Sequence, residues 1–258
     1  MAMSGTGSVS TKLAGSERTH RVHPMTLSSD GLVLCYHLVG GGVGGPVDLD
    51  VGTFEAQLRE VAPLVRPLAE VVATGKGVAL TFDDAFVNFH DVVWPRLQAQ
   101  HLAATLFVPT GFIDGTHGSP LSTAPQLRPC SWGQLASMHD EGLQIGSHSR
   151  AHKNLRGLSD DDIDADLGAA AIRLRDVLGV VETPLCYPQA KWSPRVEAVA
   201  RRHHAVIVTG GGVRVDTSRP WRVPRTSIVR GGPGLTRILR WPVEPREWLA
   251  DRVRQWRP

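Results

Sequence analysis

Short apolar runs recur along the chain and predict buried strands. They span residues 32–36, 78–82, 103–108, 143–145, 185–187 and 205–208. Each run is apolar on both faces and ends at polar or turn residues, which is typical of parallel strands that are covered on both sides.

Three serines between these runs mark predicted helix starts. Ser131 and Ser159 each precede an apolar stripe of helical period, and the stripe after Ser159 stops at Gly179. Ser193, followed by proline, opens a third predicted helix, which we expect to run through residues 201–204. Alternation of strands and helices favours a βα barrel or a doubly wound sheet.

The composition indicates one large globular domain. The chain has 258 residues, of which 41% are hydrophobic and 21% are charged, so it can bury a sizeable core. Residues 1–30 are rich in Ser, Thr and Gly and show no hydrophobic period. We therefore expect a flexible leader over residues 1–30 and a single domain over 31–258, including a C-terminal tail.

Charge and cysteine content narrow the class of protein. The net charge is only +3 and the charges are interspersed, which argues against nucleic-acid binding. No stretch has the length of apolar sequence that stable membrane insertion needs, and the first thirty residues lack the apolar core of a signal peptide. Cys35, Cys130 and Cys186 are scattered and form no CxxC pair, so we expect neither a disulfide framework nor a thiolate zinc site. These features favour a cytoplasmic location and leave the oligomeric state open.

Two consecutive carboxylates, Asp83 and Asp84, end the run at residues 78–82. Side chains at strand ends face the rim where α/β proteins build their sites, so one carboxylate could bind a metal while the other faces a water beside it. The alternative is that one aspartate caps the next helix and the other is solvated.

His148 and His152 follow the run at residues 143–145, four positions apart. A turn at this spacing can bring two neutral imidazoles to one ion, so Asp84, His148 and His152 are candidate metal ligands. Non-haem iron oxygenases use a similar set, usually on a different fold, whereas a second aspartate beside a ligand favours hydrolysis.

Several ordered motifs make the chain similar to the polysaccharide deacetylases that share the NodB homology domain. The resemblance covers residues 32 to about 229. Its motifs are Cys35-Tyr36-His37-Leu38-Val39, Thr81-Phe82-Asp83-Asp84, residues 104–108, Ser131-Trp132 with Leu135, residues 146–152 with Leu155, residues 185–188, and Arg222-Val223-Pro224-Arg225.

The resemblance implies a distorted (β/α)7 barrel that hydrolyses an N-acyl group, typically acetyl on an amino sugar. It implies a divalent metal, zinc first, with Co²⁺, Ni²⁺ or Mn²⁺ as alternatives. Carried over to this sequence, it makes Asp83 the general base and Asp84, His148 and His152 the metal ligands. It also implies an oxyanion contact from the backbone N–H of Gln189.

The chain departs from the family pattern at three places. Ala85 stands where many members have glycine, which we expect to tighten the turn without removing a ligand. No arginine precedes the 186–190 segment, and Arg225 is a candidate to steer Asp83 or the substrate carbonyl instead. No Leu-x-His motif follows residue 205, so His37, at the end of the first strand, becomes the candidate general acid. The alternative for His37 is a residue that holds a loop by hydrogen bonds.

Tyr187 and Trp192 are candidate substrate-binding residues, because they lie in and just beyond the 185–188 motif. The remaining conspicuous aromatic residues and histidines are expected to be structural, with His203 and His204 on a helical or exposed stretch. The tail at 241–258 is expected to dock on the barrel.

The sequence therefore predicts a metal-dependent N-deacylase that acts on a carbohydrate or amino sugar, with activated water as the nucleophile. A cytosolic location would favour a small amino-sugar intermediate over a cell-wall polymer. The alternatives are a catalytically inactive carbohydrate-binding relative of the same fold, and a deformylase or other linear amide hydrolase acting on a small metabolite.

Overall fold

A computed structural model describes residues 1–2, 30–212 and 214–240. The predicted leader lies outside the described residues except at its ends, and the predicted tail at 241–258 lies outside them entirely. Within the described part of the chain, no helix combines the length and apolar character that crossing a membrane requires.

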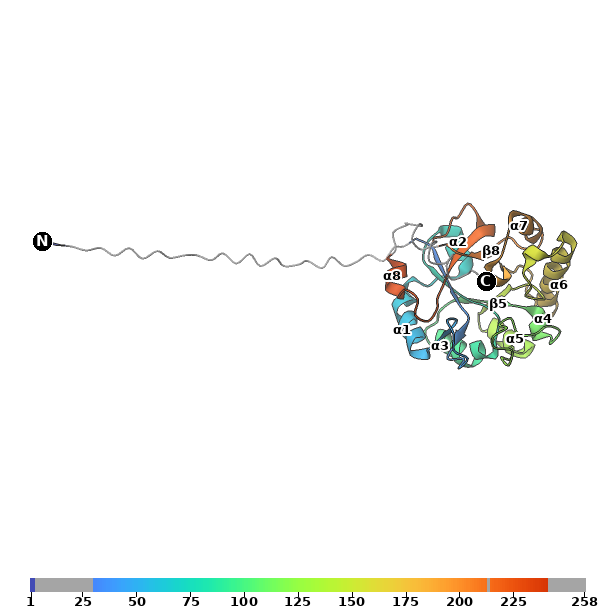
Figure 1. Ribbon diagram of the computed structural model, residues 1–258, viewed down its shortest axis with the longest axis horizontal. Coiled ribbons are helices and arrows are strands. Elements are labelled where there is room, and N and C mark those ends of the chain that lie inside the picture. Colours follow the sequence, from blue (N-terminus) through green and yellow to red (C-terminus); the bar gives the residue numbers. More distant parts are fainter. Residues whose placement is uncertain (3–29, 213, 241–258) are drawn as a thin grey trace.

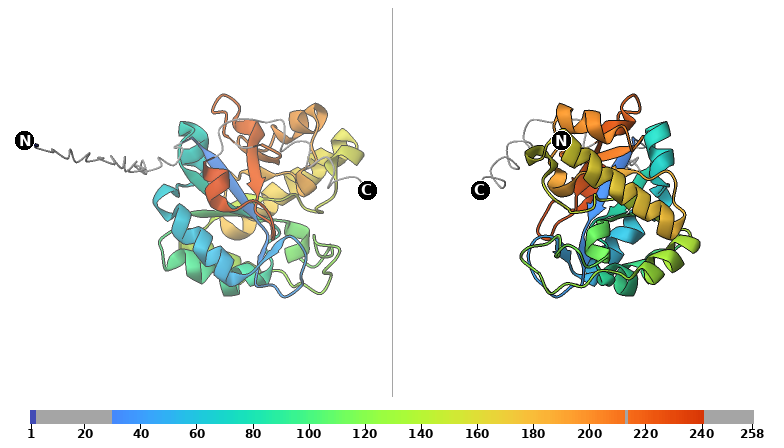
Figure 2. Two further views of the ribbon diagram at one scale, coloured as in Figure 1. Left: turned by 60° about the vertical axis from the view of Figure 1, so that its left-hand side comes forward. Right: turned by 90° about the vertical axis from the view of Figure 1, so that its right-hand side faces the viewer.

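Parallel strands close into a barrel in the order β1-β4-β5-β6-β7-β8-β9. The barrel strands among the described residues are β1 (Leu32–Tyr36), β4 (Val78–Phe82), β5 (Ala104–Val108), β6 (Gln144–Ser147), β7 (Leu185–Cys186), β8 (Ile207–Gly210) and β9 (Val223–Ser227). β1 pairs with both β4 and β9, which closes the ring, and Figure 2 shows blue β1 beside red β9. A small separate sheet pairs β2 (Leu38–Val39) with β3 (Asp48–Leu49).

Helices surround the barrel (Figure 1). The α-helices among the described residues are α1 (Val51–Val61), α2 (Leu68–Thr74), α3 (Trp94–Gln98), α4 (Thr110–Ile113), α5 (Trp132–Asp140), α6 (Asp160–Leu178), α7 (Pro194–Ala200) and α8 (Leu235–Leu239). Short 3₁₀ segments cover Ala62–Leu64, Leu155–Gly157, Pro188–Ala190 and Pro220–Arg222, and a π-helical segment covers Phe89–Val93. The fold confirms the expected (β/α)7 barrel.

Each apolar run predicted as a strand overlaps a barrel strand, with shifts of one or two residues at the ends of some. The sequence pattern did not reveal β9, because Pro224 and Arg225 interrupt its apolar character. Pro224 pairs with Thr209 of β8, although proline cannot donate a ladder hydrogen bond.

The predicted helix starts are confirmed. Ser131 forms a reciprocal capping box with Gln134, and Ser159 and Ser193 each accept a backbone N–H at the third position of their helices. α6 ends at Leu178 and is capped by Gly179, whose φ of 71° is the left-handed conformation that suits glycine.

The prediction that the helix after Ser193 runs through residues 201–204 is wrong. α7 ends at Ala200, and a turn follows. The chain turns there because His204 is buried and its Nδ1 lies 3.0 Å from the carbonyl oxygen of Thr183, which fixes the approach to β8.

Strand alternation divides the side chains into an outer shell and a barrel interior. On β1 and β4, Tyr36 and Phe82 face outward, stack at 5.2 Å and pack on Phe54 of α1. Cys35 and Thr81, one position earlier on each strand, therefore face the interior. This alternation places polar groups inside the barrel, directly below the rim.

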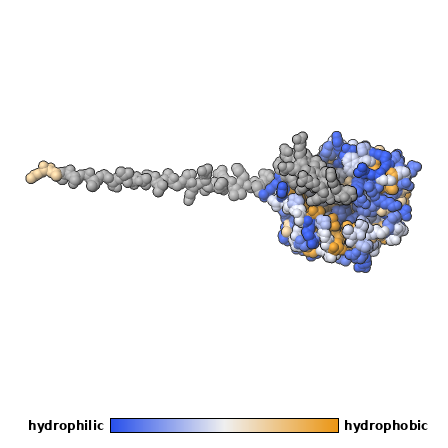
Figure 3. Space-filling view, in the orientation of Figure 1, coloured by the Kyte–Doolittle hydropathy of each residue, from blue (hydrophilic) through white to orange (hydrophobic). Residues whose placement is uncertain are grey.

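The face of the molecule in Figure 3 is mainly hydrophilic, with a smaller apolar area below its centre. Among the described residues, the strongly exposed large apolar side chains after Met1 are Ile172 and Val181. They sit singly on the surface, which is ordinary for a globular protein.

Candidate active site at the C-terminal rim of the barrel

Four predicted site residues come together where β4 and β6 end. Asp83 and Asp84 directly follow β4, and His148 and His152 lie in the loop after β6. β4 and β6 both pair with β5, so their carboxyl ends share one stretch of the rim. Asp83, Asp84 and His148 are each at least 95% buried.

The side chains of Asp84, His148 and His152 converge on one point. Asp84 Oδ1 lies 3.6 Å from His148 Nε2 and 3.5 Å from His152 Nε2. The two Nε2 atoms are 3.2 Å apart. Nitrogen and oxygen ligands of a tetrahedral zinc ion lie about 3.4 Å from one another, so the three spacings fit such an ion. Asp84 Oδ1 is also buried and has no hydrogen-bond partner, and a bound cation would supply the partner that this oxygen lacks.

A backbone contact orients the first of these imidazoles. His148 Nδ1 lies 2.8 Å from the carbonyl oxygen of Cys186, so Nδ1 carries the proton and Nε2 offers its lone pair. Burial lowers the pKa values of His148 and His152, that of His152 to about 3. Both rings are therefore neutral at physiological pH, the form that binds metal.

Helix α6 fixes the loop that carries the two histidines. The carboxylate of Asp166 accepts the backbone N–H groups of Arg150 and Ala151 at 3.0 and 2.9 Å. Ser149 Oγ accepts the N–H of His152 at 3.0 Å. These contacts hold Ser149 and His152 at positive φ, 64° and 51°, which turns the chain tightly enough to bring the second imidazole beside the first.

Asp83 differs from Asp84 in its partners. Arg225 donates to both oxygens of Asp83, from Nη1 to Oδ1 at 2.7 Å and from Nη2 to Oδ2 at 2.8 Å. Burial alone would raise the pKa of Asp83, but the guanidinium outweighs it and holds this pKa well below its usual range. Burial and the neighbouring Asp83 charge raise the pKa of Asp84. The two carboxylates thus differ in the direction of their pKa shifts, lowered for Asp83 and raised for Asp84.

Arg225 reaches Asp83 through the interior of the barrel. It lies on β9 and also contacts Thr81 Oγ1 of β4, Cys186 Sγ of β7 and the ring of Phe107 on β5. The sequence had suggested Arg225 either for Asp83 or for a substrate carbonyl. In the structure Nη1 and Nη2 of Arg225 both donate to Asp83.

Two cysteines also lie at Asp83, which their spacing in the sequence did not indicate. The thiols of Cys35 and Cys186 lie 3.5 and 3.6 Å from Asp83 Oδ2. Cys35, His37 and Asp83 form one group of possible ligand atoms, and Asp83, His148 and Cys186 form another. Barrel closure thus brings thiols that are far apart in the chain beside other possible ligand atoms, which the absence of a CxxC pair did not indicate.

His37 follows β1 and faces the same carboxylate. Its Nε2 is 3.8 Å from Asp83 Oδ2, and its side chain is 25% exposed. Burial lowers the pKa of His37, and Arg225 adds to this, while the Asp83 charge opposes it. His37 thus lies between the buried carboxylate and solvent, mainly as a neutral imidazole.

The loop after β7 places Gln189 at the rim in the left-handed conformation, with φ 57°, followed by Ala190 at φ 54°. Gln189 is exposed. Ala85, expected to tighten the turn after Asp84, has φ 50° and is completely buried. Alanine thus occupies a backbone conformation that favours glycine, and Asp84 keeps its position among the candidate ligands.

The two candidate substrate-binding aromatics differ in exposure. Tyr187 is completely buried and packs between the barrel and α7 with Leu185 and Val196, so it has no surface to offer a substrate. Trp192 is half-buried, and the guanidinium of Arg222 lies 4.4 Å from its ring centroid. An arginine therefore occupies one face of the Trp192 ring.

His204 corrects the expectation that it lies on a helical or exposed stretch, since it is only 3% exposed. It lies at the opposite end of the barrel, before β8. Burial lowers its pKa to about 4.

The chain is similar to known proteins in sequence and in fold. The sequence profile of a family described as polysaccharide deacetylase matches residues 71–208. No curated protein sequence matches the chain.

Similar solved structures share the barrel. The Streptococcus pyogenes deacetylase PplD in complex with acetate has a TM-score of 0.67 and 20% identity, covering 79% of this chain and 94% of that one. IcaB from Ammonifex degensii has a TM-score of 0.68 and 20% identity, covering 83% and 99%. A de-N-acetylase from Aggregatibacter actinomycetemcomitans has a TM-score of 0.66 and 16% identity, covering 80% and 97%. At these identities the likeness establishes the fold.

Proposed function

Because the chain belongs to the polysaccharide deacetylase family, we propose that it is a metal-dependent hydrolase that removes an N-acyl group, acetyl first, from an amino sugar or related carbohydrate. The observation that carries this proposal is the convergence of Asp84 Oδ1 and the Nε2 atoms of His148 and His152, with a second, ionised carboxylate beside them.

Asp84, His148 and His152 would hold the divalent ion, zinc first. When bound, the ion supplies a Lewis acid that polarises the amide carbonyl and lowers the pKa of a nearby water. The three residues do not form a closed four-ligand set, so positions remain for water and substrate.

Asp83 is the proposed general base. Its Oδ2 lies 3.9 Å from His148 Nε2, which places it beside the candidate ligands. Arg225 fixes the direction of the carboxylate and keeps it ionised, so that it can accept a proton from the attacking water. The low pKa makes Asp83 a weak base, and a proton that it accepts is readily passed on.

His37 is the group proposed to accept that proton from Asp83. It begins neutral, lies 3.8 Å from Asp83 Oδ2 and extends towards solvent. A proton that moves from Asp83 to His37 can protonate the leaving amine, which makes His37 the general acid. The backbone N–H of Gln189 is the proposed oxyanion donor, and Trp192 is a proposed sugar contact through the ring face opposite Arg222.

The acyl group and the substrate size belong to the same proposal. The similar Streptococcus pyogenes deacetylase was solved in complex with acetate, the product of deacetylation, which favours acetyl over formyl. The three cysteines of this chain are free thiols, as is typical of proteins in a reducing compartment. The proposed substrate is therefore a cytoplasmic amino-sugar intermediate.

Replacing each carboxylate with an amide distinguishes the proposed base, Asp83, from the proposed ligand, Asp84. We expect Asp83→Asn to retain about one bound metal ion and to lose roughly a hundredfold or more in turnover, because proton transfer is removed. Asp84→Asn should lose both metal and turnover. Elemental analysis and acetate release from N-acetyl amino sugars measure the two quantities. Asp91→Asn makes the same chemical change at an exposed carboxylate and serves as control.

Equal metal loss in the two variants would contradict the assignment of roles. A wild-type protein that binds metal and an amino sugar but releases neither acetate nor formate would favour the inactive binding relative.

The role of His37 is tested by the leaving group. His37→Ala should keep its metal and turn over more slowly. The loss of turnover should be smaller with substrates whose leaving amine needs little protonation. The pH–rate profile of the wild type should contain a limb that the variant lacks. A variant with wild-type turnover and an unchanged profile would exclude His37 as the acid.

A further inference from the structure

Cys35, His37 and Asp83 form a second set of converging metal-ligand atoms, beside the set proposed for catalysis. We propose that this second set binds a thiol-preferring divalent ion, such as cadmium or excess zinc, and that its occupation inhibits the enzyme. The inhibition rests on the proposed function, whereas the binding does not.

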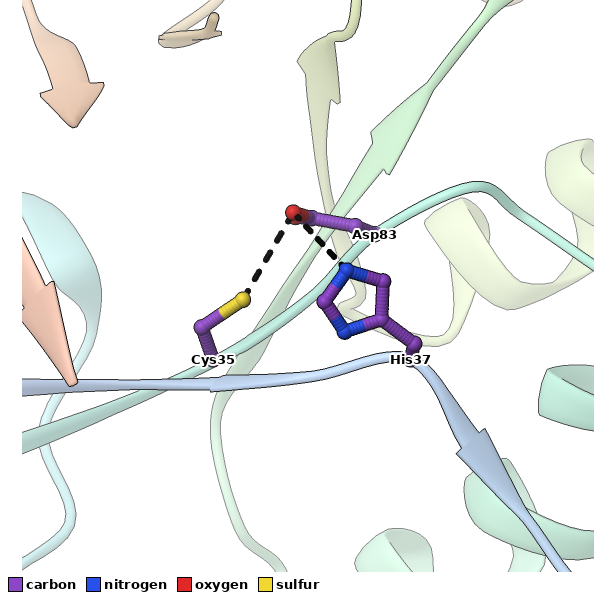
Figure 4. Close-up of side chains that lie close together, drawn as sticks. All are labelled: Cys35, His37 and Asp83. Atoms are coloured by element: carbon purple, nitrogen blue, oxygen red, sulfur yellow. Dashed lines mark hydrogen bonds and ion pairs between the residues drawn. The ribbon is translucent and has the colours of Figure 1, made fainter. Parts of the chain in front are cut away.

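Figure 4 shows the three side chains meeting at one carboxylate oxygen. Cys35 Sγ lies 3.5 Å from Asp83 Oδ2, and His37 Nε2 lies 3.8 Å from the same atom. All three candidate ligand atoms lie within 4.8 Å of one another. The residues come from the ends of two paired strands, β1 and β4, so barrel closure fixes their approach.

These distances suit a four-coordinate soft ion. Tetrahedral zinc geometry places sulfur and oxygen ligands about 3.6 Å apart and nitrogen and oxygen ligands about 3.4 Å apart. The first value is met, and a shift of about 0.4 Å in the partly exposed His37 ring would meet the second. The donor types, one thiol, one imidazole and one carboxylate, favour cadmium or zinc over magnesium or calcium.

The second set is separate from the first in its atoms. It takes Asp83 Oδ2, while the catalytic set takes Asp84, His148 and His152. The group of Asp83, His148 and Cys186 does not share this independence, because His148 Nε2 already belongs to the catalytic set. Cys35 is therefore the cysteine expected to bind the second ion.

Two features make the second ion the weaker of the two. The guanidinium of Arg225 repels a cation at Asp83, although Nη1 can keep Oδ1 at 2.7 Å when Oδ2 turns to the ion. Cys35 is a buried thiol, so binding forms a metal–sulfur bond as the S–H bond breaks and releases one proton to solvent. An ion with a strong preference for thiolate is needed to offset both costs.

The consequence for activity follows from the ligands. An ion on Asp83 Oδ2 and His37 Nε2 occupies the proposed base and the proposed acid together. Proton transfer would then stop while the catalytic ion stays in place.

Cadmium titration of the whole chain tests the binding directly. We expect two equivalents to bind, with a thiolate-to-cadmium charge-transfer band in the ultraviolet that grows with the second equivalent. Cys35→Ser should abolish the band and weaken the second binding event about tenfold or more, while the first equivalent remains. Cys130→Ser is the matched control, because Cys130 is also buried but donates to the carbonyl oxygen of Phe86, away from Asp83.

Several outcomes would overturn the proposal: a wild-type protein that stops at one equivalent without a thiolate band, a band that survives in Cys35→Ser, or a band that disappears only in Cys186→Ser. These readouts need no turnover, so the second site can fail while the deacetylase activity stands.

A second arm measures acetate release at one equivalent of zinc and again in zinc excess. The ratio of the rate in zinc excess to the rate at one equivalent should fall below one in wild type and in Cys130→Ser. It should stay near one in Cys35→Ser. Equal inhibition of wild type and Cys35→Ser by excess zinc would contradict inhibition through this site.

Discussion

At both ends of the barrel the chain reverses direction between strands and helices, but different residues occupy these reversals. At the N-terminal ends of the strands, glycines take the positive φ angles, as at Gly75, Gly77 and Gly142. At the C-terminal rim, glycines such as Gly211 share this task with six other residues. These six are Asp84, Ala85, Ser149, His152, Gln189 and Ala190. Among the described residues, His101 is the one non-glycine with positive φ that lies away from the rim.

The difference shows where the chain accepts strain. Glycine reverses the chain without a Cβ penalty, but it has no side chain to bind a ligand. Asp84 and His152 adopt the left-handed region and also carry proposed ligand atoms, which glycine could not supply. The rim therefore holds most of this backbone strain, next to the proposed catalytic groups, whereas His101 is the one non-glycine residue described at the opposite end that shares it.

The two ends also treat buried charge differently. At the rim, the Asp83 carboxylate is paired with the Arg225 guanidinium. At the opposite end, the buried His204 is kept neutral by a lowered pKa. The following predictions test this contrast, in order of decreasing effect.

Arg225→Met should have the largest effect on stability. It leaves the buried Asp83 charge without its partner, which costs about 3–5 kcal/mol of unfolding free energy. Denaturant unfolding measures the loss. Adding Asp83→Asn to Arg225→Met should recover much of it, because no charge then remains unpaired. A loss below about 1 kcal/mol in the single variant would mean that water screens the pair.

His204 should make the protein less stable as the pH falls from 6.5 to 4. Its folded-state pKa of about 4 lies below the ordinary value of 6.5, so the unfolded chain binds the proton first in this window. The stability contributed by neutral His204 is complete above pH 6.5 and falls by about 3 kcal/mol at most by pH 4.

His204→Gln should flatten this part of the stability–pH curve relative to wild type, as measured by thermal or denaturant unfolding. His101→Asn, at an exposed position, is the control for the removal of a histidine. Parallel curves for wild type and His204→Gln would show that other histidines carry the effect.

A glycine-to-alanine exchange at one end and an alanine-to-glycine exchange at the other should change the free energy of unfolding in opposite directions. Gly75→Ala should cost about 1–2 kcal/mol, because φ is 65° and a Cβ would lie 3.0 Å from Thr217 Cγ2. Ala190→Gly, at φ 54° and exposed, should gain roughly 0.5 kcal/mol, since relief of strain exceeds the added entropy of the unfolded chain. Thermal unfolding measures both, and a destabilised Ala190→Gly would contradict strain at the rim.

The sequence determined those features that depend on neighbours along the chain. The apolar runs marked their strands because a strand covered on both faces is apolar throughout. Ser131, Ser159 and Ser193 marked helix starts because a cap contacts backbone only three residues ahead. Asp84, His148 and His152 could be singled out because a strand end and one short turn bring them to the rim.

The tertiary structure alone decided what meets inside the barrel. Arg225 and Asp83 are 142 positions apart, and Cys186 and Asp83 are 103 apart. Their contact depends on the closing of β9 against β1 and on which face of each strand turns inward. The burial of Tyr187 and His204 was not predictable either, because it depends on tertiary packing, against α7 for Tyr187 and against the segment of Thr183 for His204. Local patterns fix an element and its ends, whereas a contact across a closed barrel exists only after every strand has taken its place.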